Sequence, residues 1–225
     1  MFLFHPTTLL LIPAFLLGLY AQYKVKNAYK KYSKVGNEKR INGHDAAVYL
    51  LQQNGLTDVA VEEVAGELSD HYDPRDKTVR LSSANFQGSS LAAVSIAAHE
   101  VGHAIQHANS YKPLEIRTAI LPVTNFGSML YVPLFLAGLF FQVTSLMTLG
   151  IAFFAAVVLF QVITLPVEFD ASKRAMKQLA GFGMLSSDEV VGAKKVLNAA
   201  ALTYVAATIM AAAQLLQLFM LSGEE

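Results

Sequence analysis

The chain has 225 residues, of which 54% are apolar and 15% are charged, and its 17 basic side chains balance 17 acidic ones. This composition is too apolar for an ordinary soluble domain of this length and indicates a membrane protein. The zero net charge gives no electrostatic reason to expect a nucleic-acid partner, and the absence of cysteine excludes disulfides, thiolate metal ligands and cysteine nucleophiles.

Four apolar stretches are long enough to cross a bilayer, which takes about 20 residues. The first, residues 3–22, has no Lys or Arg before its apolar run, so we expect a retained anchor rather than a cleaved signal peptide. The fifty residues between Arg117 and Glu168 carry no charge and predict two helices in a hairpin that turns near residues 142–145. Residues 198–222 supply the fourth stretch.

The basic residues are distributed unevenly along the chain. All 17 Lys and Arg residues lie in residues 23–117 and 167–197, which four spans place on one side of the membrane. The positive-inside rule assigns that side to the cytoplasm and both termini to the outside. The sequence therefore predicts a multi-pass protein whose membrane anchor, hairpin and last span occupy residues 1–22, 118–166 and 198–225.

The first segment between spans mixes helices and short strands. Residues 44–54 have helical spacing and end at Gly55. Residues 57–64 and 77–82 alternate between apolar and polar side chains and predict two strands. Residues 70–77 are polar and are expected to form the turn before the second strand.

A longer helix is expected to begin after Ser90 and to end near Asn109, and it carries the pattern HExxH at His99, Glu100 and His103. Residues four apart lie on one face of a helix, so both imidazoles can reach one zinc ion. Glu100 lies beside them, where it can accept a proton from a water whose pKa the zinc lowers. The alternative, two histidines and a glutamate buried without a shared partner, would be costly.

A catalytic zinc ion needs a third protein ligand and one open position. His107 lies eight residues after His99, about 12 Å along the helix axis, which is too far for the same ion. Two interpretations of His107 remain. In the first, it lies behind the metal ligands or on the substrate side; in the second, it is a partly exposed histidine at the end of a helix. The extended metzincin pattern is excluded, because Gln106 and Asn109 stand where it requires Gly and His.

The third ligand is predicted downstream, in a helix that begins after the third apolar stretch. Glu168 shares its helical face with Ala171 and other small residues, whereas Asp170 shares its face with Arg174 and Lys177. We therefore expect Glu168 to be the inward carboxylate and the metal ligand. For Asp170, the alternative ligand, an ion pair with Arg174 one turn later is the preferred interpretation.

Several motifs resemble those of a known family. They are DHYDP at residues 70–74, RLS at 80–82, SxAAxxxAAHEVGHAIQ at 90–106 and LPVEFDASKRA at 165–175. Together they resemble the YugP-like family of neutral zinc metallopeptidases of bacterial membranes, over nearly the whole chain after the first anchor. The resemblance implies a gluzincin-like peptidase of the bacterial cytoplasmic membrane, similar in site layout to the HtpX and CAAX-prenyl protease families, with Glu168 at the position of their downstream zinc ligand.

The chain departs from these relatives at one position. Their glutamate opens an E-x-x-A-D pattern, whereas Ser172 stands in its fifth place here. A carboxylate that orients a histidine must then come from elsewhere, and Asp70, Asp73 and Asp170 are the candidates.

Two features are expected to contact the substrate. The strand predicted at residues 77–82 precedes the metal helix, in the place where such peptidases carry an edge strand that pairs with an extended substrate; a purely structural strand is the alternative. A donor is also needed for the oxyanion that develops during hydrolysis. His71, Asn85 and Arg174 are candidates among which the sequence does not choose.

The fold class predicted is mainly α and integral to the membrane, with about four transmembrane helices and a small α+β zincin-like cytoplasmic domain. The function predicted is a Zn²⁺-dependent endopeptidase that cleaves membrane or membrane-adjacent polypeptides. The natural substrate, a homo-oligomeric state and a regulatory membrane partner are left open.

The sequence disfavours three other classes of protein. An inactive zinc-binding scaffold is disfavoured because Glu100 is intact and a structural site would close its fourth position. A transporter is disfavoured because the predicted spans contain no Asp, Glu, Lys or Arg. A site-two-type intramembrane protease is disfavoured because the HExxH helix is short for a membrane crossing and is bracketed by polar sequence.

Overall fold

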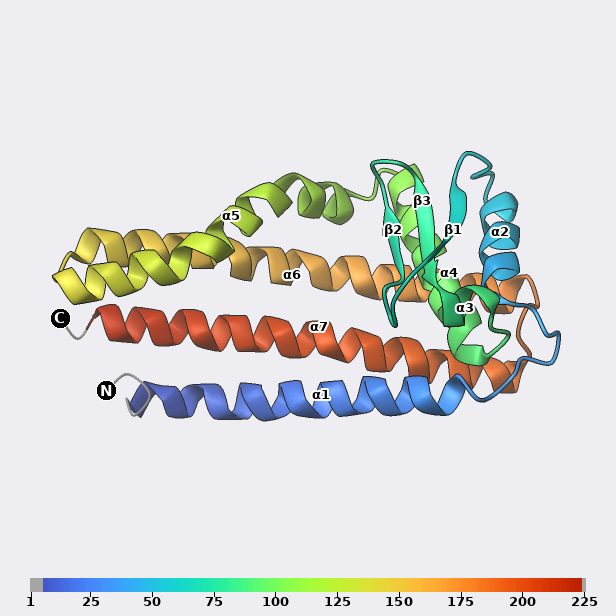
Figure 1. The fold of residues 1–225 in the computed structure, drawn as a ribbon, viewed down its shortest axis with the longest axis horizontal. Coiled ribbons are helices and arrows are strands. Elements are labelled where there is room, and N and C mark those ends of the chain that lie inside the picture. The colour runs from blue at the N-terminus through green and yellow to red at the C-terminus, as the bar shows by residue number, and fades with distance from the viewer. Residues whose placement is uncertain (1–5, 224–225) are drawn as a thin grey trace. The chain divides into compact units, whose positions relative to one another are not determined.

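The computed structural model describes residues 6–223, which are predominantly helical (Figure 1). The chain divides into two compact units. Unit 1 comprises residues 1–22, 115–166 and 202–225, and unit 2 comprises residues 23–114 and 167–201. The ends of the first and last predicted spans, residues 1–5 and 224–225, lie outside the described part of the chain.

Unit 1 is built from the apolar parts of long helices. Between residues 6 and 223, four helical stretches are long and apolar enough to cross a membrane: Pro6–Tyr32, Lys112–Phe141, Thr144–Gly181 and Ser187–Ser222. They contain α1 (Leu11–Tyr32), α5 (Lys112–Phe141), α6 (Thr144–Gly181) and α7 (Ser187–Ser222). The four predicted spans are therefore present as helices, and the hairpin turns at residues 142–143, within the predicted interval.

The helix α6 is longer than the sequence predicted. A separate helix was expected to begin after the third span, but α6 continues through Pro166 to Gly181 without a break. Proline removes one hydrogen bond from a helix, and membrane helices tolerate this loss where neighbouring groups satisfy the freed carbonyl. Glu168 therefore follows the apolar stretch within the same helix.

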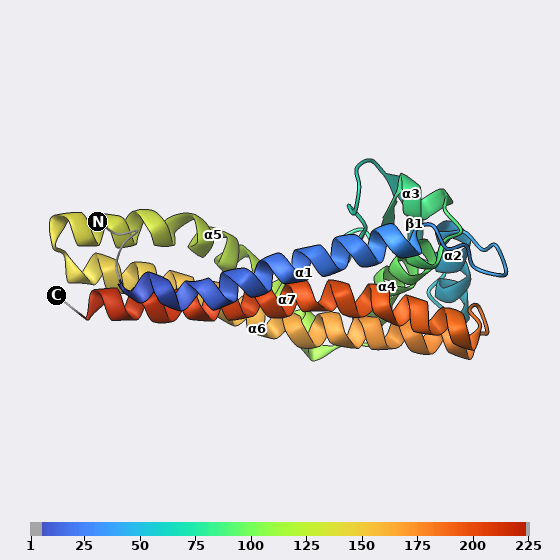
Figure 2. The ribbon, with the colours of Figure 1, turned by 90° about the horizontal axis from the view of Figure 1, so that it is seen from below.

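Within unit 1, α5 and α6 form a closely packed hairpin (Figures 1 and 2). A Cβ atom on Gly138 would lie 2.6 Å from the Cγ and backbone N atoms of Met147, so this approach requires glycine. Met147 is fully buried in a cluster with Phe135, Ile151 and Phe154. Small residues at contact points allow membrane helices to pack in this way.

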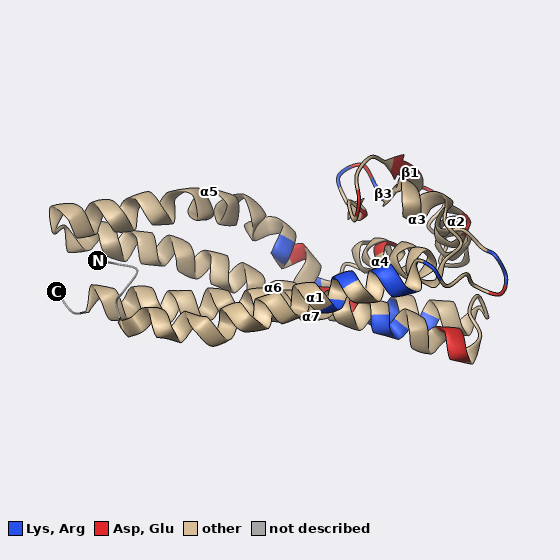
Figure 3. Cartoon of the chain, turned by 60° about the horizontal axis from the view of Figure 1, so that its bottom comes forward, with Lys and Arg blue, Asp and Glu red and all other residues tan. Residues whose placement is uncertain are grey.

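Charge distinguishes the two units. All Lys and Arg residues except Arg117 lie in unit 2, and Figure 3 shows the helices of unit 1 with few charged positions. Large apolar side chains of unit 1 are exposed, including Phe126 at 59% and Phe140 at 82%. An apolar, uncharged surface of this kind is suited to lipid rather than to water.

Unit 2 contains a mixture of helices and strands. Its shorter elements are α2 (Gly43–Gln53), β1 (Ala60–Val64), β2 (His71–Asp73), β3 (Thr78–Ser82), α3 (Ser83–Gln87) and α4 (Leu91–Ala108). The helix predicted at 44–54 and the strands predicted at 57–64 and 77–82 are confirmed to within three residues at each end. The short helix α3 was not predicted.

The sheet corrects two expectations about the strands. The described residues form a sheet in the order β1-β3-β2, with β1 parallel and β2 antiparallel to β3. The strand predicted at residues 77–82 is therefore the middle strand, and the prediction that it pairs with substrate as an edge strand is wrong. Its backbone groups pair with Ala60–Val64 on one side and with His71–Asp73 on the other. The expected polar turn at residues 70–77 is also partly wrong, because it contains β2.

The helix α4 lies in the core of unit 2. Its N-cap is Ser90, whose Oγ accepts a hydrogen bond from the Ala93 N–H, and its C-cap is Asn109, as the sequence predicted. Most of its side chains are buried, and α4 contacts α2, α3, β2 and β3. A Cβ atom on Gly102 would lie 2.6 Å from the Ala171 carbonyl oxygen of α6, so the two helices approach closely at this glycine.

Candidate metal centre

Three side chains of unit 2 converge from α4 and α6. Ligand atoms of His99, His103 and Glu168 all lie within 4.8 Å of one another. Glu168 Oε2 lies 3.2 Å from His99 Nε2 and 3.7 Å from His103 Nε2. The two histidines lie one helical turn apart on α4, and Glu168 comes from a helix 65 residues further along the chain. The structure thus brings together the three residues that the sequence proposed as metal ligands.

Small residues on α6 allow this convergence. Ala171 and Ala175 lie one and two turns after Glu168, and all three are buried, at 0%, 0% and 3% exposure. Because Gly102 on α4 contacts the Ala171 backbone directly, the Glu168 carboxylate reaches the histidines. The expectation that Glu168 faces inward with its small neighbours agrees with this burial.

The donor set suits a zinc ion. Imidazole nitrogens and carboxylate oxygens bind zinc at about 2.0–2.2 Å, so two donors of a tetrahedral site lie roughly 3.4 Å apart. The observed separations of 3.2 and 3.7 Å between Glu168 Oε2 and the two Nε2 atoms bracket that value. Three protein ligands with a fourth position open are characteristic of catalytic rather than structural zinc.

The other ring nitrogen of each histidine has its own partner. His99 Nδ1 lies 3.2 Å from Ser172 Oγ, and His103 Nδ1 lies 3.0 Å from Gln106 Oε1. Ser172 occupies the position where the resembling families carry a carboxylate, and its hydroxyl lies beside His99. Gln106 was not predicted in this role. Its one available signal was its position three residues after His103, on the same helical face.

Glu100 is buried beside His99, His103 and Glu168, at 7% exposure. Burial raises the pKa of its carboxyl group above the ordinary value, because it disfavours the charged form. The negative charges of Glu168 and Asp70 act in the same direction, whereas positive charge on His99 and His103 acts against it. A carboxyl group with a raised pKa is suited to taking up and releasing a proton.

Asp170 lies outside the group of three side chains that could hold a metal ion among the described residues. Its Oδ2 accepts a hydrogen bond of 2.5 Å from Arg174 Nε, so the predicted ion pair one helical turn apart is present. The same oxygen accepts a hydrogen bond of 2.9 Å from Gln106 Nε2. Among the three carboxylates proposed to orient a histidine, Asp170 is thus connected to His103 through Gln106.

The sequence was compared with known protein families and proteins. Residues 7–223 match the model of a family described as "putative neutral zinc metallopeptidase". The chain belongs to this family. It is 48% identical over 212 residues to "Putative membrane protease YugP" of Bacillus subtilis (strain 168), with 94% of each sequence covered. No solved structure matches the chain. The family resemblance drawn from the motifs is therefore confirmed.

In this metallopeptidase family member, Asp70 and Asn85 contact each other. Asn85 Nδ2 donates a hydrogen bond of 2.8 Å to Asp70 Oδ2, and Ser82 N–H donates one of 2.8 Å to Asp70 Oδ1. The Tyr29 hydroxyl donates to Asn85 Oδ1 at 3.3 Å. Asn85 is 1% exposed, so its amide is engaged within the fold rather than presented to a substrate.

The remaining candidates lie on or beside the sheet. His71 is exposed on β2, with its Nδ1 2.7 Å from the Ser69 carbonyl oxygen. Asp73 forms an ion pair with Arg75 at 2.6 Å and lies 4.0 Å from Arg80. Neither His71 nor Asp73 belongs to the group among residues 6–223 that could hold a metal ion.

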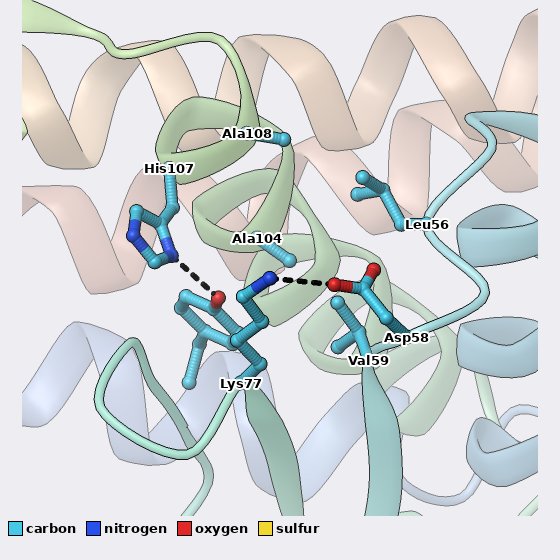
Figure 4. A pocket seen from close by; sticks show the side chains of 8 residues that line it. Leu56, Asp58, Val59, Lys77, Ala104, His107 and Ala108 are labelled. Atoms are coloured by element: carbon cyan, nitrogen blue, oxygen red, sulfur yellow. Dashed lines mark hydrogen bonds and ion pairs between the residues drawn. The ribbon is translucent and has the colours of Figure 1, made fainter.

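A cavity of about 200 Å³ opens beside the C-terminal half of α4 (Figure 4). Its lining residues are Leu56, Asp58, Val59, Tyr72, Lys77, Ala104, His107 and Ala108. The Tyr72 hydroxyl lies 2.8 Å from His107 Nδ1, and Lys77 Nζ lies 2.6 Å from Asp58 Oδ2, as the dashed lines in Figure 4 show. His107 therefore forms part of the cavity wall and does not belong to the group of His99, His103 and Glu168.

The Tyr72 hydroxyl remains protonated at neutral pH. Burial raises the pKa of Tyr72 to about 12, and the negative charges of Asp58, Asp73 and Asp76 act in the same direction. A protonated phenol can donate its hydrogen to His107 Nδ1. This hydrogen bond connects β2 to α4 at the cavity wall.

Proposed function

We propose that the chain is an active zinc-dependent endopeptidase in which His99, His103 and Glu168 bind Zn²⁺ and Glu100 is the general base. The observation that carries this proposal is the convergence of three ligand atoms within 4.8 Å, with Glu100 buried beside them. Zinc bound there would lower the pKa of a water molecule and polarise the carbonyl of the peptide bond to be cleaved.

Glu100 transfers the proton in this reaction. It accepts a proton from the attacking water as the water oxygen bonds to the carbonyl carbon of the substrate. When the bond between carbon and nitrogen breaks, Glu100 returns the proton to the amine that leaves. The carboxyl group thus ends each cycle in the state in which it began.

The cavity beside α4 accepts one apolar side chain of the substrate. Ala104 follows His103 directly, and His107 lies four residues after His103, about 6 Å along the helix axis. A volume of about 200 Å³ is smaller than the roughly 300–1,000 Å³ of pockets for whole small molecules, and it suits a single side chain. Leu56, Val59 and Ala108 contribute apolar surface to it.

The substrate is a polypeptide at the cytoplasmic surface of a bacterial inner membrane. The support is the positive-inside rule, because all Lys and Arg residues lie between the first and second or the third and fourth apolar stretches. Glu168 is the first charged residue after the third stretch, so the metal-binding group is close in sequence to a span. Both termini then lie outside.

This topology can be tested with single cysteines, because the natural chain has none. Ser110 and Ser145 are both exposed and lie in predicted segments on opposite sides of the membrane. A maleimide that does not cross membranes should label Ser145→Cys in intact cells and should label Ser110→Cys only after lysis. Labelling of Ser110→Cys from outside would overturn the orientation.

The function is tested with Glu100→Gln in purified protein. We expect proteolysis of an unfolded test polypeptide to fall by about 10²–10⁴-fold, the usual contribution of a general base, while zinc content stays near one ion per chain. A chelator should abolish the wild-type activity, and added zinc should restore it. Wild-type protein that binds zinc and cleaves no polypeptide would instead identify an inactive zinc-binding scaffold.

A further inference from the structure

We infer that Gln106 is a positioning residue that holds the ring proton of His103 on Nδ1 and thereby keeps Nε2 free to bind the metal. The inference rests on the proposed zinc site and adds a residue that acts on it through another side chain. A histidine binds a metal through a nitrogen that carries no hydrogen, and the group bonded to its other nitrogen decides which one that is.

The amide of Gln106 can be oriented from its neighbours. Gln106 is 0% exposed, and its Nε2 lies 2.8 Å from the Val167 carbonyl oxygen and 2.9 Å from Asp170 Oδ2. A carbonyl oxygen and a carboxylate oxygen can only accept hydrogen bonds, so the NH₂ group of the amide must face them. This assignment uses both hydrogens of the amide nitrogen.

The orientation of the amide determines the state of His103. Gln106 Oε1 lies 3.0 Å from His103 Nδ1, and an amide oxygen can only accept. His103 Nδ1 must therefore donate, and its proton is held on that nitrogen. Nε2, which faces Glu168 at 3.7 Å, is then the nitrogen available to an ion.

Asp170 fixes Gln106 in this orientation. Its Oδ2 is also held by Arg174 Nε at 2.5 Å, and the Arg174 guanidinium lies 5.8 Å from the centre of the Tyr111 ring. Arg174, one turn later on α6, thus fixes the Asp170 carboxylate that accepts a hydrogen bond from the Gln106 amide. Asp170, predicted as an alternative metal ligand, acts here behind the ligands.

His99 and His103 differ in whether the partner of Nδ1 determines which ring nitrogen carries the proton. Ser172 Oγ lies 3.2 Å from His99 Nδ1, but a hydroxyl can rotate to donate or to accept. Ser172 therefore does not select one protonation state of His99. Gln106 does select one for His103, because its nitrogen is already committed to two acceptors.

Two substitutions of Gln106 separate positioning from packing. Gln106→Met keeps the approximate size and removes every hydrogen bond. Gln106→Glu keeps an oxygen acceptor for His103 Nδ1, loses both donors and places a second carboxylate beside Asp170. The dissociation constant for zinc is measured in detergent by competition with a chelator, and the unfolding temperature is measured on zinc-free protein.

We expect the two measurements to rank the variants in opposite orders. Gln106→Met should weaken zinc binding by about 10–100-fold, the usual effect of removing a partner behind a metal ligand. Gln106→Glu should bind zinc more tightly than Gln106→Met, although its zinc-free form should unfold at the lower temperature of the two. If Gln106 only joined α4 to α6, both measurements would rank Gln106→Glu last.

Gln178→Met is the matched control. Gln178 is on α6, and its amide exchanges two hydrogen bonds of 3.0 Å with Asn54 on the end of α2 without touching a histidine. We expect this variant to lose thermal stability and to keep the wild-type zinc affinity. Unchanged zinc affinity in Gln106→Met would overturn the inference, whereas a wild-type chain that binds no zinc would overturn the proposed function itself.

Discussion

The two flanks of α4 are packed in opposite ways. On the flank that faces α6, a Cβ atom on Gly102 would lie 2.6 Å from the Ala171 carbonyl oxygen, and Gln106 is fully buried. On the flank that faces the sheet, Ala104, His107 and Ala108 line a cavity of about 200 Å³. A metal site needs donors fixed to within fractions of an ångström, whereas a substrate needs room. One helix thus presents its closed flank to Glu168, the proposed metal ligand, and its open flank to the cavity.

The largest effect on zinc binding is expected from removing Glu168, the proposed ligand on the closed flank. Glu168→Ala should weaken zinc binding by more than about 100-fold, which exceeds the usual effect of a residue behind the ligands, and proteolysis should be lost with it. Asp170→Ala should weaken binding less, because it acts through Gln106. Zinc affinity can be measured by chelator competition. Loss of zinc in Asp170→Ala with retention in Glu168→Ala would reverse the ligand assignment.

Adding a methyl group at the contact between α4 and α6 should lower both the stability of the protein and its zinc affinity. Gly102→Ala places a methyl group against the Ala171 backbone, and overpacking of this kind costs about 1–3 kcal/mol. The free energy of unfolding and the zinc affinity should both fall. Gly181→Ala is the control, because nothing lies within 4 Å of its Cβ position, and it should be neutral or slightly stabilising. Equal stability of the two variants would show that the close approach is not required.

The closed flank also shows which residues of the candidate site could be predicted from the sequence. The spacing of His99 and His103 on one helix, and of Glu168 with its small neighbours on another, depends on local periodicity, and the structure brings these residues together. The role of Gln106 depends on Val167 and Asp170, which lie about sixty residues away, so helical spacing alone could not identify it. The expectation that residues 77–82 form an edge strand failed for the same reason, because the partners of β3 are set by tertiary pairing.

The ends of the helices were predicted with uneven success. The start of α4 was predicted at residues 88–90, and Ser90 is its N-cap, since a serine side chain satisfies a free backbone N–H at a helix start. The length of α6 could not be predicted, because Pro166 is a usual place for a helix to end. The helix α3, with five residues, is too short to show a period.

A substitution on the open flank should change substrate use and leave the metal in place. Ala108 is exposed at the cavity, so Ala108→Leu should narrow the space without disturbing the core. We expect kcat/KM to fall by about tenfold for peptides with a bulky apolar side chain at the cleavage site, and less for peptides with alanine there. Zinc content should match the wild type. An equal loss of kcat/KM for both peptides would show that the cavity does not bind the substrate side chain.

The smallest effect is expected from a substitution at the cavity wall, where it should lower only the free energy of unfolding. Tyr72→Phe removes the hydroxyl that lies 2.8 Å from His107 Nδ1, and one such hydrogen bond contributes about 0.5–1.5 kcal/mol. The free energy of unfolding should fall by about that amount, as measured by denaturant titration, with zinc affinity unchanged. A large loss of zinc in this variant would mean that the two flanks are not independent.

The central claim is that one metal ion binds where α4 and α6 meet. The most direct measurement is anomalous scattering at the zinc absorption edge from crystals of the zinc-loaded protein. We expect one peak per chain within coordination distance of His99 Nε2, His103 Nε2 and a Glu168 oxygen, with a fourth position left for water. A zinc-loaded crystal with no peak between these side chains, or with the ion held by a different set of residues, would contradict it.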